Sequence, residues 1–78
     1  MKELDTVVLI HDIKEHGLKK GDMGAIVHEY KDGKAFEVEF VTADGKTVAL
    51  LTLKSSDIRP MAKNELLHVR DFASSASM

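Results

Sequence analysis

A small all-β domain is the fold class that the sequence predicts. Asp-Gly pairs stand at residues 32–33 and 44–45, between runs that are rich in β-branched, aliphatic and aromatic side chains. An Asp-Gly pair in such a setting is the strongest short-range signal of a β-hairpin. Residues 21–53 are therefore expected to form three antiparallel strands joined by two tight turns. A chain of 78 residues corresponds to one domain with a thin core.

The composition argues against several classes of protein. The chain has no cysteine, so neither a disulfide framework nor a thiolate zinc site is expected. The apolar run at residues 7–10 is too short for a secretory signal or a membrane span. The net charge is −2, with 11 basic and 13 acidic residues interleaved, which favours an ordinary solvated surface. A cytoplasmic protein without a membrane partner is the expectation.

The first strand is expected at residues 6–10, where the sequence TVVLI is continuously apolar and predicts burial on both faces. Residues 11–22 are polar and are predicted to form a long loop, which Ile13 and Leu18 hold against the domain. Loops of this length are often functional. The alternative is a loop that only covers one open end of a barrel.

The predicted three-stranded segment has one clearly patterned strand. Residues 35–41 alternate, and Phe36, Val38 and Phe40 share the face that is expected to form the centre of the core. For the strand at residues 25–30, the face that bears Ala25, Val27 and Glu29 is the expected core face. The strand at residues 47–53 is apolar on both faces. It is therefore predicted to be central, or to have its outer face covered by the C-terminal segment or by a partner chain.

One short helical turn is expected at residues 55–57, since Ser-Ser-Asp favours side-chain capping. A short fifth strand follows around residues 58–61, where Pro60 excludes a central position. The resulting order is strand, long loop, three-stranded meander, helical turn and short last strand. This order of five short antiparallel strands matches a small SH3-like barrel.

Residues 4–60 also resemble a small bacterial family, domain of unknown function 4926. The resemblance rests on the valine-rich first strand, the glycine pair in GDMG, FEVEF at residues 36–40 and SDIRP at residues 56–60, which occur in this order. It implies an SH3-like fold and no catalytic residue, because the family has no assigned activity. Its members often sit beside another small gene. This implies an antitoxin-like or immunity-like role toward a neighbour-encoded protein.

The sequence divides into a barrel at residues 1–61, an extension at residues 62–72 and a disordered tail at residues 73–78. The extension is expected to form an extra strand, with Leu67 and Val69 on one side. A short helix capped at Asn64 is the alternative. Its apolar residues exceed what a small barrel needs. They are therefore predicted either to close the barrel or to dock on a partner or a twin chain.

A non-enzymatic module that binds an unidentified partner protein is the function that the sequence predicts. The candidate partner-binding residues lie in the extension, in the first loop and at the end of the second strand: Leu66, Leu67, His68, Val69, Arg70, Phe72, Lys19, Lys20 and Tyr30. A homodimer through a strand edge or through the extension is a further alternative. No cofactor is expected.

Catalytic and metal-binding patterns are weak in this sequence. The four histidines, at positions 11, 16, 28 and 68, lack the ligand spacing of a metal site. The serines lie in a turn or in the tail, where no triad is indicated, and GDMG lacks the spacing of a phosphate-binding loop. Glu37 and Glu39 are interpreted as a solvated acidic face. No catalytic, cofactor-binding or metal-ligating residue is therefore predicted.

Nucleic-acid binding is the alternative function, as a KOW or SH3-like module. The Gly-x-x-Gly entry into the second strand is compatible with it, and four lysines are expected to line one end of the barrel: Lys14, Lys19, Lys20 and Lys34. The net charge of −2 and the lack of exposed stacking aromatics other than Tyr30 argue against it.

Overall fold

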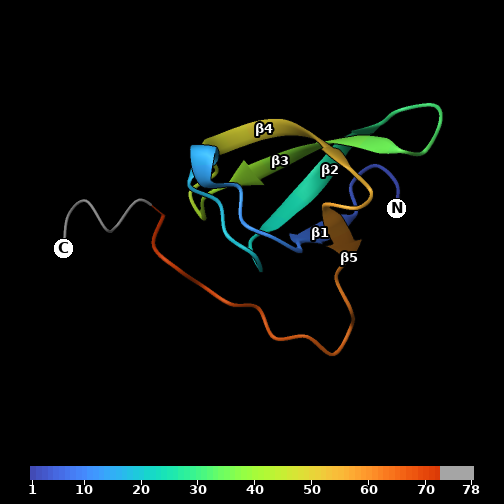
Figure 1. The fold of residues 1–78 in the computed structure, drawn as a ribbon. Helices are drawn as coiled ribbons and strands as arrows, with labels where there is room; N and C mark the ends of the chain where they lie inside the picture. Colours follow the sequence, from blue (N-terminus) through green and yellow to red (C-terminus); the bar gives the residue numbers. More distant parts are fainter. Residues whose placement is uncertain (73–78) are drawn as a thin grey trace.

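The computed structural model describes residues 1–72, and the predicted disordered tail lies outside these residues. Five antiparallel strands form one strongly curved sheet (Figure 1). They are β1 (Thr6–Leu9), β2 (Met23–Glu29), β3 (Ala35–Val41), β4 (Thr47–Lys54) and β5 (Ile58–Pro60). A single-turn 3-10 helix, η1 (Lys14–His16), lies in the long loop between β1 and β2. The all-β prediction and the long first loop are confirmed.

The strand order in the sheet is β4-β3-β2-β1-β5, which is the order of the predicted SH3-like barrel. β1 lies between β2 and β5, with Val7 opposite Gly24 and Leu9 opposite Ile58. No ladder joins β4 to β5 within the described part of the chain, so the sheet is open. Of the two alternatives for residues 47–53, the central strand is wrong, because within residues 1–72 β4 pairs only with β3. We call the sheet and its connections, residues 1–60, the barrel.

The two Asp-Gly turns adopt the geometry that the sequence predicts. Gly33 and Gly45 have φ angles of 68° and 84°, in the left-handed region that glycine tolerates without strain. The amide of Gly33 donates to the carbonyl of Tyr30 at 2.9 Å, and that of Gly45 donates to Thr42 at 2.9 Å. These turns fix the β2–β3 and β3–β4 hairpins locally.

The core lies on the concave face of the sheet. Its buried residues come from all five strands and from the first loop: Val7, Leu9, Leu18, Ile26, Phe36, Val38, Phe40, Ala49, Leu53 and Ile58. Burial of Phe36, Val38 and Phe40 confirms the core face of β3, and burial of Leu18 confirms how the loop is held.

The predicted core face of β2 is wrong. Ile26 is fully buried and pairs with Val38, whereas Val27 is exposed. The register shifts between Ile26 and His28, so Val27 is the extra residue of a β-bulge. A bulge interrupts the period of two, and the alternation counted along this strand therefore does not identify its core face.

Residues 55–57 form a tight turn, and the predicted helical turn there is wrong. The amide of Asp57 donates to the carbonyl of Lys54 at 2.8 Å. The Asp57 carboxylate accepts a hydrogen bond from the Lys54 amide, also at 2.8 Å. The backbone and the side chain of Asp57 thus both bond to Lys54 and close the turn. β5 begins at the next residue, Ile58. The short helical turn lies in the first loop instead.

Residues 61–72 contain neither the predicted extra strand nor the alternative helix. This segment, which we call the arm, leaves the end of β5 and runs away from the sheet before it returns toward the first loop (Figure 1). A hydrogen bond of 3.2 Å from the Glu65 amide to the Ala62 carbonyl closes a turn near its start. Within residues 1–72, no helix has the length and apolar character needed to cross a membrane.

Candidate functional site

The arm is joined to the barrel at its start by a bidentate ion pair. Arg59 lies in β5, and its Nη1 and Nη2 atoms donate to Glu65 Oε1 and Oε2 at 2.7 and 2.6 Å. Glu65 Oε1 also accepts the amide of Ala62 at 2.7 Å. Paired, parallel hydrogen bonds between a guanidinium and a carboxylate fix orientation as well as distance. This first anchor sets the direction in which the arm leaves β5.

A second ion pair joins the far end of the arm to the first loop. Arg70 Nε donates to Asp22 Oδ1 at 2.8 Å, and Nη2 donates to Oδ2 at 2.5 Å. The same Nη2 donates to the carbonyl of Gly17 at 3.0 Å. The side chains of Arg70 and Asp22 are only 27% and 15% exposed, so this second anchor is better shielded from water than the first.

An aromatic contact reinforces the second anchor. A Cβ atom added at Gly17 would lie 3.4 Å from two ring atoms of Phe72, so the ring packs directly on this glycine. The guanidinium of Arg70 lies 5.7 Å from the centre of the same ring, within the range of a cation–π contact. The end of the arm therefore packs on the first loop through both charge and apolar surface.

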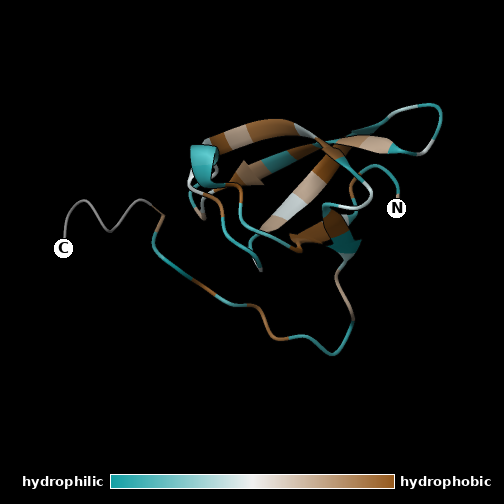
Figure 2. Cartoon of the chain, in the orientation of Figure 1, coloured by the Kyte–Doolittle hydropathy of each residue, from teal (hydrophilic) through white to brown (hydrophobic). Residues whose placement is uncertain are grey.

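Between the two anchors, the arm exposes a short apolar segment, residues 66–69. The side chains of Leu66, Leu67 and Val69 are 94%, 68% and 89% exposed. Figure 2 shows hydrophobic residues along the arm, separated by hydrophilic ones. Within residues 1–72, no backbone–backbone hydrogen bond involves residues 66–72. The segment thus presents unburied aliphatic groups and unpaired backbone groups together.

The carboxylates of both anchors are stabilised in their charged form. The Arg59 side chain, followed by the Ala62 amide, lowers the pKa of Glu65 to about 2. Burial alone would raise the pKa of Asp22, but hydrogen bonds from Arg70 and from the Lys19 amide outweigh it, and the pKa is lowered. Both anchors are therefore fully charged at neutral pH.

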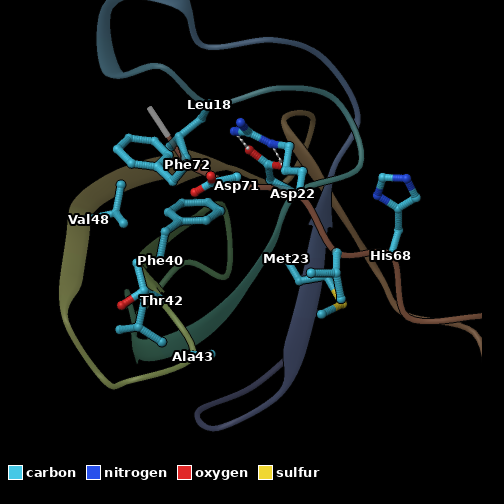
Figure 3. Close-up of a pocket in the computed structure, with 13 residues that line it drawn as sticks. Leu18, Asp22, Met23, Phe40, Thr42, Ala43, Val48, His68, Asp71 and Phe72 are labelled. Atoms are coloured by element: carbon cyan, nitrogen blue, oxygen red, sulfur yellow. Dashed lines mark hydrogen bonds and ion pairs between the residues drawn. The ribbon is translucent and has the colours of Figure 1, made fainter. Parts of the chain in front are cut away.

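An open pocket of about 570 Å³ lies between the end of the arm and the end of the barrel. Figure 3 shows Phe40 and Val48 on the barrel side and Phe72 on the arm side, with the Arg70–Asp22 hydrogen bonds beside them. Pockets of this volume can hold a small ligand or a large side chain. Because apolar atoms dominate its walls, the pocket suits an apolar group.

The structure brings several predicted partner-binding residues together at one end of the barrel. Arg70 and Phe72 contact the first loop, which also carries Lys19 and Lys20. The two lysines are exposed, and their amides donate to Asp22 and to Asp12 at 2.8 Å. His68 lines the pocket. Val69 lines the pocket as well, whereas Leu66 and Leu67 lie nearer the start of the arm and are exposed.

Tyr30 does not belong to this surface. It lies next to the turn between β2 and β3, which projects from the side of the sheet opposite to the first loop (Figure 1). Its hydroxyl donates to Glu37 Oε1 at 3.3 Å, and its ring makes an edge contact with His28, with centroids 4.8 Å apart. Lys34 lies in the same turn. The prediction that it lines one end together with Lys14, Lys19 and Lys20 is therefore wrong.

The histidines are dispersed over the barrel and the arm. Within residues 1–72, no three His, Asp or Glu side chains gather in a way that could hold a metal ion. His11 Nε2 lies 2.8 Å from Asp57 Oδ1 and links the first loop to the turn before β5. A hydrogen bond with the Asp12 carbonyl, followed by that with Asp57, raises the pKa of His11.

Sequence reasoning missed the residues that position the arm. Asp22 and Gly17 are partners of Arg70, 48 and 53 positions away in the chain, and no local pattern connects such residues. Arg59 and Glu65 are only six positions apart, but Arg59 lies in β5 and Glu65 in the arm, so no helix or strand pair places them side by side. The sequence offered one signal: an arginine precedes the apolar segment, at position 59, and another follows it, at position 70.

The comparison with known proteins identifies the barrel but not the arm. The family described as Domain of unknown function (DUF4926) matches residues 3–60. The match ends with the last residue of β5, so the arm lies beyond it. No curated protein and no solved structure matches the sequence. Since the matched region covers most of the chain, the protein belongs to the DUF4926 family.

Proposed function

We propose that this protein is a non-enzymatic binding module that presents residues 66–69 to a partner protein. The observation that carries the proposal is the exposure of Leu66, Leu67 and Val69 between two ion-pair anchors. Large aliphatic groups that stay exposed on a fixed segment are typical of interaction sites. A merely unstructured tail would not need two bidentate Arg–carboxylate pairs to hold it.

Strand addition is the mode of binding that fits this segment. A partner with an open sheet edge can pair with the free backbone groups of residues 66–69, while their side chains occupy apolar pockets. Ordering a free peptide on binding costs conformational entropy. The two anchors restrict the arm before binding, so that cost is reduced.

The chemistry of the exposed segment indicates the class of partner protein. It is a protein with an apolar surface next to a sheet edge. The family resemblance supports a bacterial setting and an antitoxin-like or immunity-like role toward a neighbour-encoded protein, and the lack of cysteine suits the cytoplasm. A second copy of this chain is the other partner that the exposed arm suits, in a homodimer.

The experiment is an affinity capture with the tagged full chain from lysate of the source organism, with and without nuclease. We expect one protein in stoichiometric amount, identified by mass spectrometry, that survives nuclease treatment. Recovery that disappears with nuclease and weakens steeply with salt would overturn the proposal in favour of nucleic-acid binding.

Matched variants locate the contact on the arm. Leu66→Ser/Leu67→Ser removes two exposed aliphatic groups from the arm and should abolish capture. Leu4→Ser/Val27→Thr removes exposed aliphatic groups from the barrel and should leave capture intact. Deletion of residues 62–78 should also abolish capture while the barrel remains folded, as judged by its amide spectrum. Equal loss in both double variants would contradict the assignment to the arm.

A further inference from the structure

A second unpartnered element, distinct from the arm, lies at the β4 edge of the sheet. β4 is eight residues long and, in the part of the chain that the structure describes, pairs only with β3. Within residues 1–72, the backbone groups of residues 48–53 make no hydrogen bond outside this ladder. A long edge strand that is neither covered nor twisted away is a template for strand addition.

Two carboxylates are held over this edge. Glu37 and Glu39 are on β3, and they lie opposite Thr52 and Leu50 of β4, on the convex face of the sheet. Thr52 Oγ1 donates to Glu37 Oε1 at 2.6 Å, and Thr47 Oγ1 donates to Glu39 Oε2 at 2.7 Å. These hydrogen bonds join both carboxylates to side chains of the edge strand, although Glu37 Oε1 also accepts the Tyr30 hydroxyl at 3.3 Å. Within residues 1–72, the second oxygen of each carboxylate has no hydrogen bond.

An apolar side chain, that of Leu50, lies directly opposite Glu39 and two positions from Thr52, the partner of Glu37. Leu50 is 53% exposed and shares the convex face with Thr52. The ion pairs within residues 1–72 use other carboxylates, so Glu37 and Glu39 keep their negative charge uncompensated. The lysines of β4 and its preceding turn, Lys46 and Lys54, lie at the ends of the strand. The middle of the edge is therefore acidic around one aliphatic group.

We propose that the β4 edge binds an extended basic segment of a protein by strand addition. The segment would place an apolar side chain beside Leu50 and a Lys or Arg two positions away on either side, where it meets Glu37 and Glu39. Residues at alternate positions of a strand share a face, so this spacing follows from the pleat. Opposite charges on neighbouring strands stabilise pairing.

Charge selects this occupant over the others that suit an open edge. A second copy paired through its own β4 would bring four carboxylates to one face, and like charges disfavour such pairing. The phosphates of a nucleic acid would also meet Glu37 and Glu39 and be repelled. This surface is independent of the arm, so the inference does not rest on the function proposed above.

The test is a titration of the isotope-labelled full chain with three blocked peptides, followed through its amide resonances. The peptides are extended, threonine-rich sequences with Lys-x-Val-x-Lys, Glu-x-Val-x-Glu or Ser-x-Val-x-Ser at their centre. We expect the lysine peptide to shift the amides of residues 48–53 and to leave residues 66–69 unchanged. The glutamate peptide should not bind, and binding of the lysine peptide should weaken as salt is raised.

Two double variants with the same change in net charge complete the test. Glu37→Gln/Glu39→Gln keeps hydrogen-bond acceptors for Thr52 and Thr47. It should lower the affinity for the lysine peptide by about threefold to tenfold, as expected for the loss of two exposed ion pairs. Glu15→Gln/Glu29→Gln, on the first loop and the end of β2, should leave affinity unchanged. Equal binding of the three peptides, shifts confined to residues 66–69, or no shift near a millimolar peptide concentration would overturn the proposal.

Discussion

The barrel and the arm use the same residue types in opposite ways. In the barrel, Val7, Ile26 and Val38 have no exposed surface, and sheet ladders pair their backbone groups. In the arm, Leu66 and Val69 are almost fully exposed, and the described backbone of residues 66–72 has no backbone partner. The barrel is held by packing, whereas the arm is held at its two ends by ion pairs.

This difference separates the origin of stability from the presentation of a surface. Burial of apolar area contributes most of the free energy of folding. Exposed ion pairs contribute little to it, but they can restrict the geometry of a segment. We therefore expect substitutions in the barrel to change stability, and substitutions in the arm to change mobility and binding.

The largest effect is expected from a truncation in the core. Phe36→Ala removes a buried ring and should lower the free energy of unfolding by about 3–5 kcal/mol. A domain of this size has a stability of roughly 5 kcal/mol, so the variant should be largely unfolded. Circular dichroism and urea denaturation measure the change. Retention of a cooperative transition near that of the parent would contradict the assignment of Phe36 to the core.

The close approach of β2 to β3 gives the next effect. A Cβ atom at Gly24 would lie 2.7 Å from Val38 Cγ1 and 3.0 Å from the Glu39 carbonyl oxygen. Gly24→Ala should therefore lower the free energy of unfolding by about 1–3 kcal/mol through overpacking. Val38→Ala removes the nearest methyl group, so the same substitution should cost less in that background. Strict additivity in a double-mutant cycle would argue against the contact.

Strands β3 and β2 show where the sequence is sufficient to predict the fold and where it is not. The Asp-Gly turns and the alternation of β3 are local patterns, so Phe36, Val38 and Phe40 could be placed in the core from sequence. The bulge at Val27 is not local, because it depends on how β2 is paired with β3. Because of the bulge, Ile26 lies on the core face, opposite Val38, whereas His28, two positions further on, lies on the convex face, opposite Glu37.

The candidate site was predictable only in part. The surplus of aliphatic residues at 66–69 identified the segment, because a small barrel has no room for them. Its conformation was not predictable, because it depends on Asp22, which lies 48 positions from Arg70. Alternation favoured a strand, but the ion pairs hold the end of the arm against the first loop, and residues 62–72 pair with none of the five strands. Contacts with distant residues, and not the local alternation, therefore determine the conformation of the arm.

Breaking the second anchor should release the end of the arm without unfolding the barrel. Arg70→Gln removes the bidentate pair with Asp22 and should lower the free energy of unfolding by only about 0.5–1.5 kcal/mol. Nitrogen-15 relaxation should show increased motion on the picosecond-to-nanosecond timescale at residues 66–72. Lys63→Gln removes a positive charge from the start of the arm and serves as the control. Unchanged relaxation in Arg70→Gln would show that Phe72 alone holds the arm.

Acid should release the first anchor. The pKa of Glu65 is lowered from 4.5 to about 2 in the folded protein. The contribution of the pair is therefore complete above pH 4.5, decreases below it and is lost as the pH falls through about 2. The amide shifts of residues 62–65 should report this step. Glu65→Gln should abolish the step, and a step of equal size in that variant would assign it to another group.

The smallest effect on stability is expected from the residues that we propose for binding. Leu66→Ser/Leu67→Ser changes two side chains that are already in water, so the free energy of unfolding should stay within about 0.5 kcal/mol of the parent value. Urea denaturation of both proteins in parallel measures the difference. A loss on the order of several kcal/mol would mean that these leucines pack on the barrel, and the arm would then belong to the core. If the urea midpoint is unchanged and capture is lost, the two leucines serve binding and not folding. Contact with a partner would then be the reason why these aliphatic side chains are exposed.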